Sequence, residues 1–401
     1  MKLLFGVLTV CTIALTSTIT LAAQSVGVSF PAGVDKVSLP FKTADNLVLI
    51  DVGLNEKTGT FIFDTGAEST VVNSSFAKSV GLTNKGTTTG NGSAGSATAG
   101  IIRGVKLSVG QITAGGVTVY SLQLDAFAPA LGHRIDGILG NDIIGKLVAE
   151  IDHPAATLTL YQPGAFSPAS NGQKLALSIQ GGVPFVRTTV NVDGKRTIPA
   201  KLEIDTGSTG ALLLNSPFVR KYRLTTTLSN YLDAKTGGVG GTGTSKIARI
   251  KGVNLGPFNI SQPIAQLYTG TKGDNASTRY DGLLGSAIFR RFRMTIDMSR
   301  KQLYLEPNDR LNEEFDTDMT GMTLVADGDD LASVLIDEVK PNSAAAKAGI
   351  AGGEIIMSIN GRSNLSLQEV RRLFRTAGEY EITLKRGTRI LNIHLKLKRI
   401  I

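Results

Sequence analysis

The sequence predicts a mainly β protein, in which two related lobes precede a smaller α+β module. Three observations support this fold class: a pair of motifs that occurs twice at matched spacing, strand-like alternation up to residue 307, and a different pattern after residue 318. The 401 residues suffice for two or three domains, each with its own core. The single cysteine and three histidines exclude a disulfide framework and disfavour a cysteine- or histidine-rich metal site.

The charge balance does not indicate a particular partner. The chain has 42 Lys and Arg against 33 Asp and Glu, a formal charge of +9. The excess is spread thinly, without a run of five basic residues or interleaved aromatic side chains. We interpret it as a solvated surface and expect no nucleic-acid partner.

The first residues have the three-part pattern of an export signal. Lys2 supplies a positive start, residues 3–21 are uncharged and largely apolar, and Ala22 and Ala23 are small residues before Gln24. We predict a signal peptide over residues 1–23 and a periplasmic, cell-envelope or secreted location. No later stretch approaches 18 uncharged apolar residues, so no stable membrane span is expected after cleavage. Retention of the segment as an anchor remains the alternative.

The repeat defines two lobes, over residues 30–163 and 174–307. Residues 61–67 (FIFDTGA) reappear as residues 202–208 (LEIDTGS), and residues 136–140 (DGILG) reappear as residues 281–285 (DGLLG). Each second block leads into a similar ending, with Ile-Asp at 151–152 and at 296–297. Residues 164–173, rich in Pro, Ser, Ala and Asn, are the natural linker.

Strands are expected through most of each lobe, and helices are expected to be short. Alternating β-branched segments bounded by glycine predict strands at 48–52, 105–109, 117–124, 185–192 and 246–255. Short helices are expected at 142–148 and 287–292, each after a Leu-Gly pair.

The chemistry is expected at the two Asp-Thr-Gly triplets. A single triplet favours an ordinary turn, because Asp and Gly favour turns. Equivalent positions in two lobes point instead to Asp64 and Asp205 meeting across a pseudo-two-fold axis. Two adjacent carboxyl groups cannot both ionise cheaply and therefore share a proton. One can then take a proton from water while the other hydrogen-bonds a substrate carbonyl, a scheme that uses no metal or cofactor.

The neighbouring residue types suit this arrangement. The threonine hydroxyls could bond across the axis, glycine permits close approach, and the small fourth residues leave room for a water molecule. The supporting residues are Thr65, Gly66 and Ala67 in the first loop and Thr206, Gly207 and Ser208 in the second. Asp136 and Asp281 are expected to be turn or capping residues, and residues 138–139 and 283–284 to be core.

At these motifs, residues 30–307 resemble the aspartic peptidases, particularly the retropepsin-like members. The resemblance implies an acid-protease fold and an extended or unfolded polypeptide as substrate. It departs from pepsin in lacking the matching cysteines and a flap tyrosine between Asp64 and Val119. The glycine-rich stretches 90–95 and 237–243 are flap candidates; ordinary exposed hairpin tips are the equal alternative.

The third module, over residues 319–401, resembles a bacterial-type PDZ domain. The resemblance rests on the sequences AGI at 348–350, GEII at 353–356 and ING at 359–361, with a helix expected at 366–376. It implies a groove in which a peptide C-terminus adds as a strand. Its carboxylate would meet backbone amides of Gly321, Met322, Thr323 and Leu324. On the helix, ligand contact is expected only near Gln368, Arg371 and Arg372.

The sequence thus predicts an exported aspartic endopeptidase with a peptide-binding module. The alternative is a catalytically inactive scaffold that binds peptides through the PDZ groove. The presence of both Asp-Thr-Gly triplets favours the enzyme.

Overall fold

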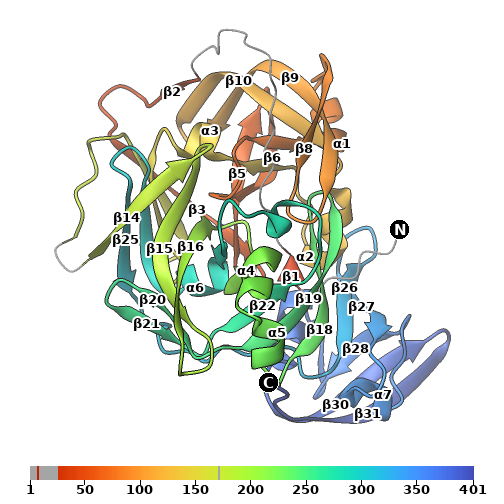
Figure 1. Ribbon diagram of the computed structural model, residues 1–401. Helices are drawn as coiled ribbons and strands as arrows, with labels where there is room; N and C mark the ends of the chain where they lie inside the picture. Colours follow the sequence, from red (N-terminus) through yellow and green to blue (C-terminus); the bar gives the residue numbers. More distant parts are fainter. Residues whose placement is uncertain (1–6, 9–25, 170–171) are drawn as a thin grey trace. The chain divides into compact units, whose positions relative to one another are not determined.

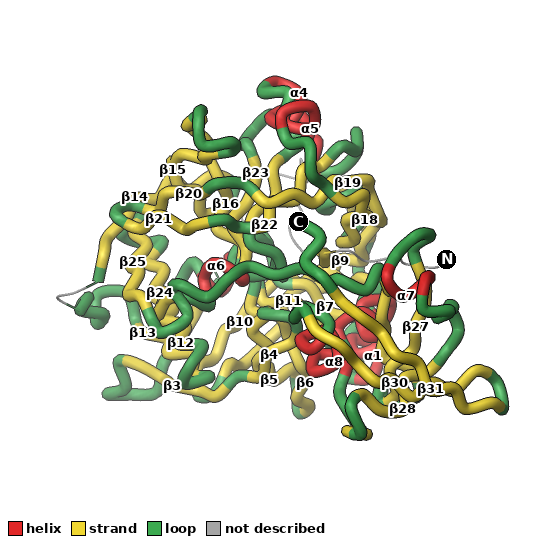
Figure 2. Tube along the Cα trace, turned by 90° about the horizontal axis from the view of Figure 1, so that it is seen from below, coloured by secondary structure: helices red, strands yellow, loops and turns green. Residues whose placement is uncertain are grey.

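The computed structural model describes residues 7–8, 26–169 and 172–401, which fold into two compact units (Figure 1). Of these residues, one unit contains 7–8, 26–124, 135–169 and 172–314, and the other contains 125–134 and 315–401. The predicted mainly β class is confirmed: strands dominate both units, and the helices between them are short (Figure 2). Among the described residues, no helix combines the length and apolar character needed to span a membrane.

The first-lobe sheet carries the first Asp-Thr-Gly loop. Its strands, in spatial order, are β2 (Gly27–Ser29), β10 (Ile112–Leu122), β7 (Val71–Asn73), β11 (Gly137–Leu139), β6 (Lys57–Phe63), β5 (Leu47–Leu54), β9 (Ser96–Val109) and β8 (Thr87–Asn91), with β4 (Lys42–Ala44) beside β5. Strands β6 and β11 are parallel, the others around them mostly antiparallel. Helix α1 (Ser74–Ser79) follows β7, and α3 (Asn141–Ile144) follows β11.

The second lobe repeats this arrangement around β16. Its strands, in spatial order, are β1 (Val7–Leu8), β18 (Leu232–Gly238), β19 (Gly241–Arg249), β22 (Ile264–Tyr268), β17 (Leu212–Leu214), β23 (Gly282–Gly285), β16 (Thr197–Asp205) and β15 (Val183–Asn191). Strand β20 (Gly252–Leu255) pairs with β15, and β21 (Phe258–Ser261) pairs with β20. The helical segments are α4 (Ser216–Lys221), α5 (Leu224–Thr227), η2 (Asp274–Ala276) and α6 (Ser286–Phe289). Apart from β1, the expected signal segment lies outside the described residues.

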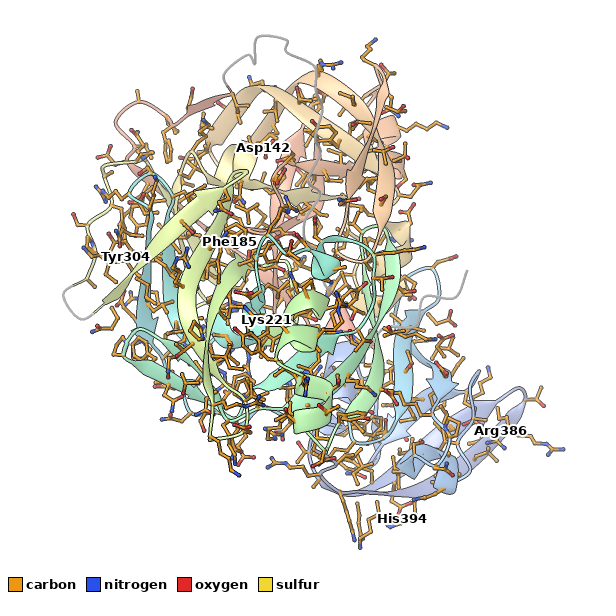
Figure 3. The ribbon with its side chains drawn as sticks, in the orientation of Figure 1. Asp142, Phe185, Lys221, Tyr304, Arg386 and His394 are labelled. Carbon is orange, nitrogen blue, oxygen red and sulfur yellow. The ribbon has the colours of Figure 1, made fainter. Side chains whose placement is uncertain are left out.

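A shared sheet joins the lobes and carries the pseudo-two-fold axis. Its order is β3 (Lys36–Pro40), β13 (Thr157–Tyr161), β12 (Val148–Asp152), β24 (Phe292–Asp297), β25 (Gln302–Pro307) and β14 (Gln173–Gln180). Asp152 pairs with Arg293, and its repeat counterpart Asp297 pairs with Val148, so exchanging the lobes leaves the register unchanged. Tyr304 of β25, labelled in Figure 3, packs with Val148 and Phe166 in one apolar cluster.

The expected helices at 142–148 and 287–292 are wrong in extent. Helix α3 ends at Ile144, since Gly145 follows and Val148 already begins the antiparallel strand β12. Helix α6 ends at Phe289 for the same reason, because β24 begins at Phe292. The expected strand at 246–255 is divided into β19 and β20 by residues 250–251.

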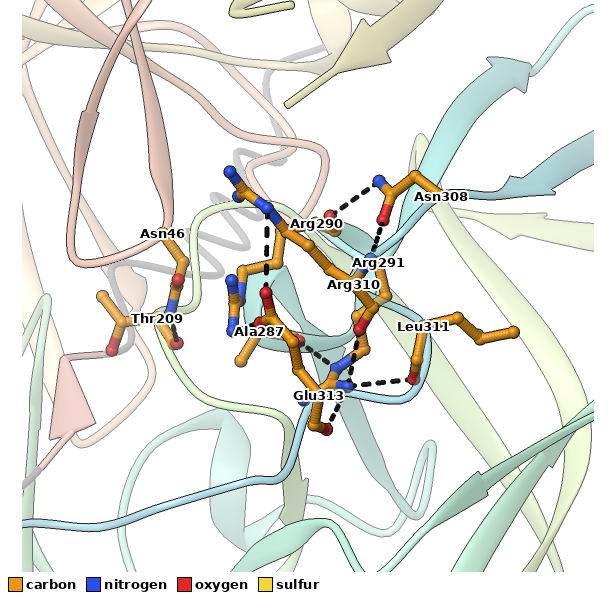
Figure 4. A network of polar contacts seen from close by, with 9 residues as sticks. All are labelled: Asn46, Thr209, Ala287, Arg290, Arg291, Asn308, Arg310, Leu311 and Glu313. Atoms are coloured by element: carbon orange, nitrogen blue, oxygen red, sulfur yellow. Dashed lines mark hydrogen bonds and ion pairs between the residues drawn. The ribbon is translucent and has the colours of Figure 1, made fainter. Parts of the chain in front are cut away.

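A buried arginine holds residues 310–313, which follow the second lobe, by hydrogen bonds (Figure 4). The guanidinium of Arg291, 1% exposed, donates to the carbonyls of Arg310, Leu311 and Glu313 at 2.5–3.0 Å. Its Nε donates to the Ala287 carbonyl at 3.2 Å. Burial lowers the pKa of Arg291 to about 10, so it stays charged at neutral pH.

The C-terminal unit is a sheet with one longer helix over a core. The strands lie in the order β26 (Met322–Asp327), β27 (Ser333–Val339), β28 (Ile355–Ile359), β30 (Gly378–Arg386) and β31 (Arg389–Leu397), with β29 (Arg362–Ser363) beside β28. Helix α7 (Ala344–Lys347) follows β27, and α8 (Leu367–Leu373) begins with a Ser366–Glu369 capping box. Leu367, Val370 and Phe374 are core residues, and their helical spacing places them on one face.

One segment of the first-lobe sequence belongs to this unit by its packing. Residues Asp125–Arg134 lie between β10 and β11 in the chain and form η1 (Asp125–Phe127) and α2 (Ala128–Leu131). The last turn ends at Gly132, whose φ of 67° is the left-handed geometry that glycine adopts without strain.

Candidate active site

The two Asp-Thr-Gly loops begin where the central strands of the lobes end. Strand β6 ends at Phe63, directly before Asp64, and β16 ends at Asp205. Each strand has a parallel neighbour from the later motif, β11 beside β6 and β23 beside β16. The amide of Asp64 donates to the Leu139 carbonyl at 3.1 Å. The second motif of each lobe therefore fixes the position of the first.

The two threonines join the loops across the lobe boundary. The Thr65 hydroxyl donates to the Ile204 carbonyl at 2.6 Å, and the Thr206 hydroxyl donates to the Phe63 carbonyl at 2.7 Å. In return, each hydroxyl oxygen accepts the backbone N–H of the other threonine. All four bonds are buried, so they hold the two loops in one fixed arrangement.

The structure brings Asp64 and Asp205 together, both 0% exposed. A Cβ on Gly207 would lie 2.2 Å from Asp64 Oδ2, which leaves room only for glycine beside the first carboxyl group. Amides of Gly66 and Gly207 donate to Oδ1 of the aspartate in their own loop, each at 2.8 Å. Burial raises the pKa of Asp64 to about 6, while hydrogen bonds from Gly66 and with Asp205 oppose that rise.

The remaining residues predicted around the aspartates are buried in the same two loops. Ala67 is 3% exposed and Ser208 is 1% exposed. Their backbone carbonyls accept from the amides of Asn141 and Ser286, the first residues of α3 and α6. Thus the small fourth residue of each motif is tied to the helix that follows the second motif.

Two side chains that hold the loops were not singled out by the sequence. Asn141 Nδ2 donates to the Thr65 carbonyl at 2.7 Å, and Ser286 Oγ donates to the Thr206 carbonyl at 2.9 Å. The two residues occupy equivalent positions directly after the Leu-Gly pair. The repeat itself was the signal that could have found them, although one lobe uses an amide and the other a hydroxyl.

Asp136 and Asp281 are structural, as expected of turn residues. The Asp136 carboxylate accepts the Thr60 amide at 2.8 Å, and the Asp281 carboxylate accepts the Lys201 amide at 2.8 Å. Both carboxylates therefore brace the middle of the strand, β6 or β16, that leads to a catalytic candidate.

Two acidic residues of the first lobe, Glu68 and Asp142, make the site asymmetric. The Asp142 carboxyl accepts the Thr70 hydroxyl at 2.7 Å (Asp142 is labelled in Figure 3), and burial raises its pKa to about 6. Burial also raises the pKa of Glu68 to about 7, against the opposing charge of Arg279. At the equivalent positions of the second lobe, 287 and 209, alanine and threonine stand in place of these two acids.

Both flap candidates lie at hairpin tips, and the two tips meet. Residues 92–95 connect β8 to β9, and residues 239–240 connect β18 to β19. The Ala94 amide donates to the Val239 carbonyl at 3.5 Å, and a Cβ on Gly95 would lie 2.4 Å from the Gly240 carbonyl oxygen. The backbones approach this closely because both tips lack side-chain bulk.

The predicted carboxylate loop of the C-terminal unit already has partners for two of its amides. Gly321 N donates to Asp318 Oδ2 at 2.7 Å, and Met322 N donates to the Thr320 hydroxyl at 2.9 Å. Thr323 and Leu324 continue into β26, where both pair with β27. On α8, Gln368 and Arg371 make contacts described below, and Arg372 is exposed.

Comparison with known families agrees with this geometry. Residues 50–143 match the family described as aspartyl protease, and residues 335–385 match the family described as PDZ domain. The chain thus contains a segment similar to an aspartyl protease domain and, C-terminal to it, a segment similar to a PDZ domain, in the expected order. A search of curated proteins returned no match.

Proposed function

We propose that this protein is an exported aspartic endopeptidase in which Asp64 and Asp205 activate water for peptide-bond hydrolysis. The observation that carries the proposal is the pair of buried carboxyl groups held by reciprocal threonine hydrogen bonds. A buried, proton-sharing pair supplies an acid and a base at the same pH.

The chemistry requires only proton transfers between the pair, water and substrate. The ionised carboxylate takes a proton from water, whose oxygen bonds to the peptide carbonyl carbon. The protonated carboxyl group hydrogen-bonds the carbonyl oxygen, on which negative charge develops. The C–N bond then breaks, and the leaving nitrogen receives a proton from the pair. Because the protons belong to the pair, the starting form is not assigned to one residue.

Substrate recognition follows from the surrounding parts. The meeting hairpin tips suit a cover over an extended, unfolded polypeptide, and the PDZ domain supplies a second site for a chain end. Export follows from the pattern of residues 1–23. N-terminal sequencing of the mature protein should begin near Gln24; retention of Met1 would contradict cleavage.

The decisive test is cleavage of an unfolded, carboxymethylated protein between pH 3 and pH 8. Asp64→Asn and Asp205→Asn should each reduce the rate by about 100-fold or more. Asp51→Asn, at an exposed position of β5, serves as the matched control and should retain full activity. Undiminished cleavage by either active-site variant would overturn the proposal. A wild type that binds peptides and cleaves none would favour the inactive peptide-binding scaffold.

A further inference from the structure

The free edge of the PDZ sheet is the surface on which an added peptide strand would be expected to bind. Strand β26 lies at one edge of the sheet, and α8 packs against it. In this recognition mode, main-chain groups of an edge strand bind the peptide, and neighbouring side chains select it. A peptide can therefore add to this sheet only if the edge of β26 is uncovered.

That edge is covered by residues Asp125–Arg134, which pack with the PDZ domain in one compact unit. Helix α2 of this segment contacts β26. The C-terminal end of α2 is fixed by Gln368 of α8, whose side-chain amide donates to the Leu131 carbonyl at 3.0 Å. Arg134 donates to the Asp329 carbonyl, just beyond β26, at 2.7 Å.

The apolar contact lies between these two hydrogen bonds. A Cβ on Gly132 would lie 3.5 Å from Leu367 Cβ and 3.9 Å from Ala326 Cβ, which is ordinary van der Waals contact. Leu131 is 1% exposed. The segment thus places the C-terminal end of α2 against Ala326 of β26 and Leu367 of α8.

Groups of the PDZ domain itself engage the rest of the same edge. The Arg371 guanidinium donates to the Leu324 carbonyl at 2.8 Å. Nearer the start of the strand, Asp318 accepts the Gly321 amide with its own carboxylate. An incoming chain with a terminal carboxylate would compete with these internal partners.

We propose that residues Asp125–Arg134 are an internal ligand of the PDZ domain, which a peptide with a free C-terminal carboxylate must displace. Binding of the two is then mutually exclusive, and each weakens the other by the same factor. The segment leads through Ile135 and Asp136 into β11, the strand beside β6. Release of the segment therefore frees the chain that leads into β11, and β11 supports the strand before Asp64. This inference goes beyond the proposed hydrolysis, and its test does not depend on peptidase activity.

A disulfide trap tests the contact in the full chain with Cys11→Ser. Gly132→Cys and Ala326→Cys would place two Cβ atoms about 3.9 Å apart, within the range of a disulfide. We expect a mild oxidant to link them within one molecule, shown by the mass of the cross-linked tryptic peptide. Gly132→Cys with Val325→Cys is the matched control, because consecutive strand residues point to opposite faces. No link, or equal linking in the control, would overturn the proposal.

Two further measurements address competition and any misfolding of the cysteine variant. The probe is a fluorescein-labelled decapeptide pool, randomised in its last four positions, with a free carboxylate. The Gly132→Cys, Ala326→Cys variant should bind this peptide pool more tightly when reduced than when oxidised. Arg134→Ala should bind the pool about three- to tenfold more tightly than the wild type. Hydrogen exchange of residues 125–134 should also accelerate in Arg134→Ala. Equal binding by the two trap forms, including none in either, or unchanged exchange, would overturn the proposal.

Discussion

The backbone amide of Thr65 donates to the Thr206 hydroxyl oxygen at 3.0 Å, and the amide of Thr206 donates to the Thr65 hydroxyl oxygen at 3.1 Å. Each hydroxyl therefore accepts a backbone N–H from the other lobe and donates to a backbone carbonyl of that same lobe. Because the bonds are reciprocal and buried, the two threonine hydroxyls hold together the loops that carry Asp64 and Asp205.

Thr65→Val should destabilise the protein and lower its activity. Valine keeps the shape but leaves the Ile204 carbonyl and the Thr206 amide without this hydroxyl, which costs about 1–3 kcal/mol for each buried group. Urea unfolding gives the stability, and cleavage of the unfolded protein substrate gives the activity. Thr65→Ser, which keeps the hydroxyl, is the control and should lose less of both. If valine and serine were equivalent, the hydrogen bonds would not hold the site.

The duplicated motifs made the two aspartates and the two threonines predictable, because all four belong to a repeated triplet. Asn141 and Ser286 escaped prediction since their roles depend on equivalent positions and not on a shared side chain. The packing of residues Asp125–Arg134 was not predictable from their sequence, which contains no local sign of a distant partner. The two short helices ended earlier than predicted, because the following residues pair as strands β12 and β24 across the two-fold axis.

Asn141→Ala and Ser286→Ala should have the same kind of effect, because both residues hold the carbonyl that follows an active-site aspartate. Each loses one buried hydrogen bond, for about 1 kcal/mol of stability. We expect a larger proportional fall in kcat than in the folded fraction, since the loops become less rigid. Steady-state kinetics and urea unfolding provide the comparison, with exposed Ser167→Ala as the control. Unchanged kcat in both variants would exclude this positioning role.

Gly95→Ala should separate the two hairpin tips. Its new Cβ would lie 2.4 Å from the Gly240 carbonyl oxygen, so the backbones must move apart. Because the contact joins two turns between strands and not the strands themselves, we expect KM for the unfolded substrate to rise several-fold while the thermal midpoint changes little. Gly115→Ala is the matched control, because a Cβ there meets no atom within 4 Å. An unchanged KM for Gly95→Ala would favour ordinary hairpin tips over flaps.

The raised pKa of Asp64 predicts that stability falls as pH rises through the acidic range. In the folded protein, burial raises the pKa of the Asp64 carboxyl group, which titrates as one member of the pair with Asp205, to about 6, whereas its ordinary pKa is 3.8. Between these values the unfolded chain has already lost the proton, so raising the pH favours unfolding; above about pH 6 the cost is complete. Asp64→Asn removes the titrating group and should stabilise the protein relative to wild type, by on the order of 2–3 kcal/mol at pH 7 and little at pH 3.5. Urea unfolding at both pH values measures this difference, and a stability gain that does not grow with pH would contradict a raised pKa. Cleavage by the wild type should decline over the same upper limb, as the pair loses its shared proton.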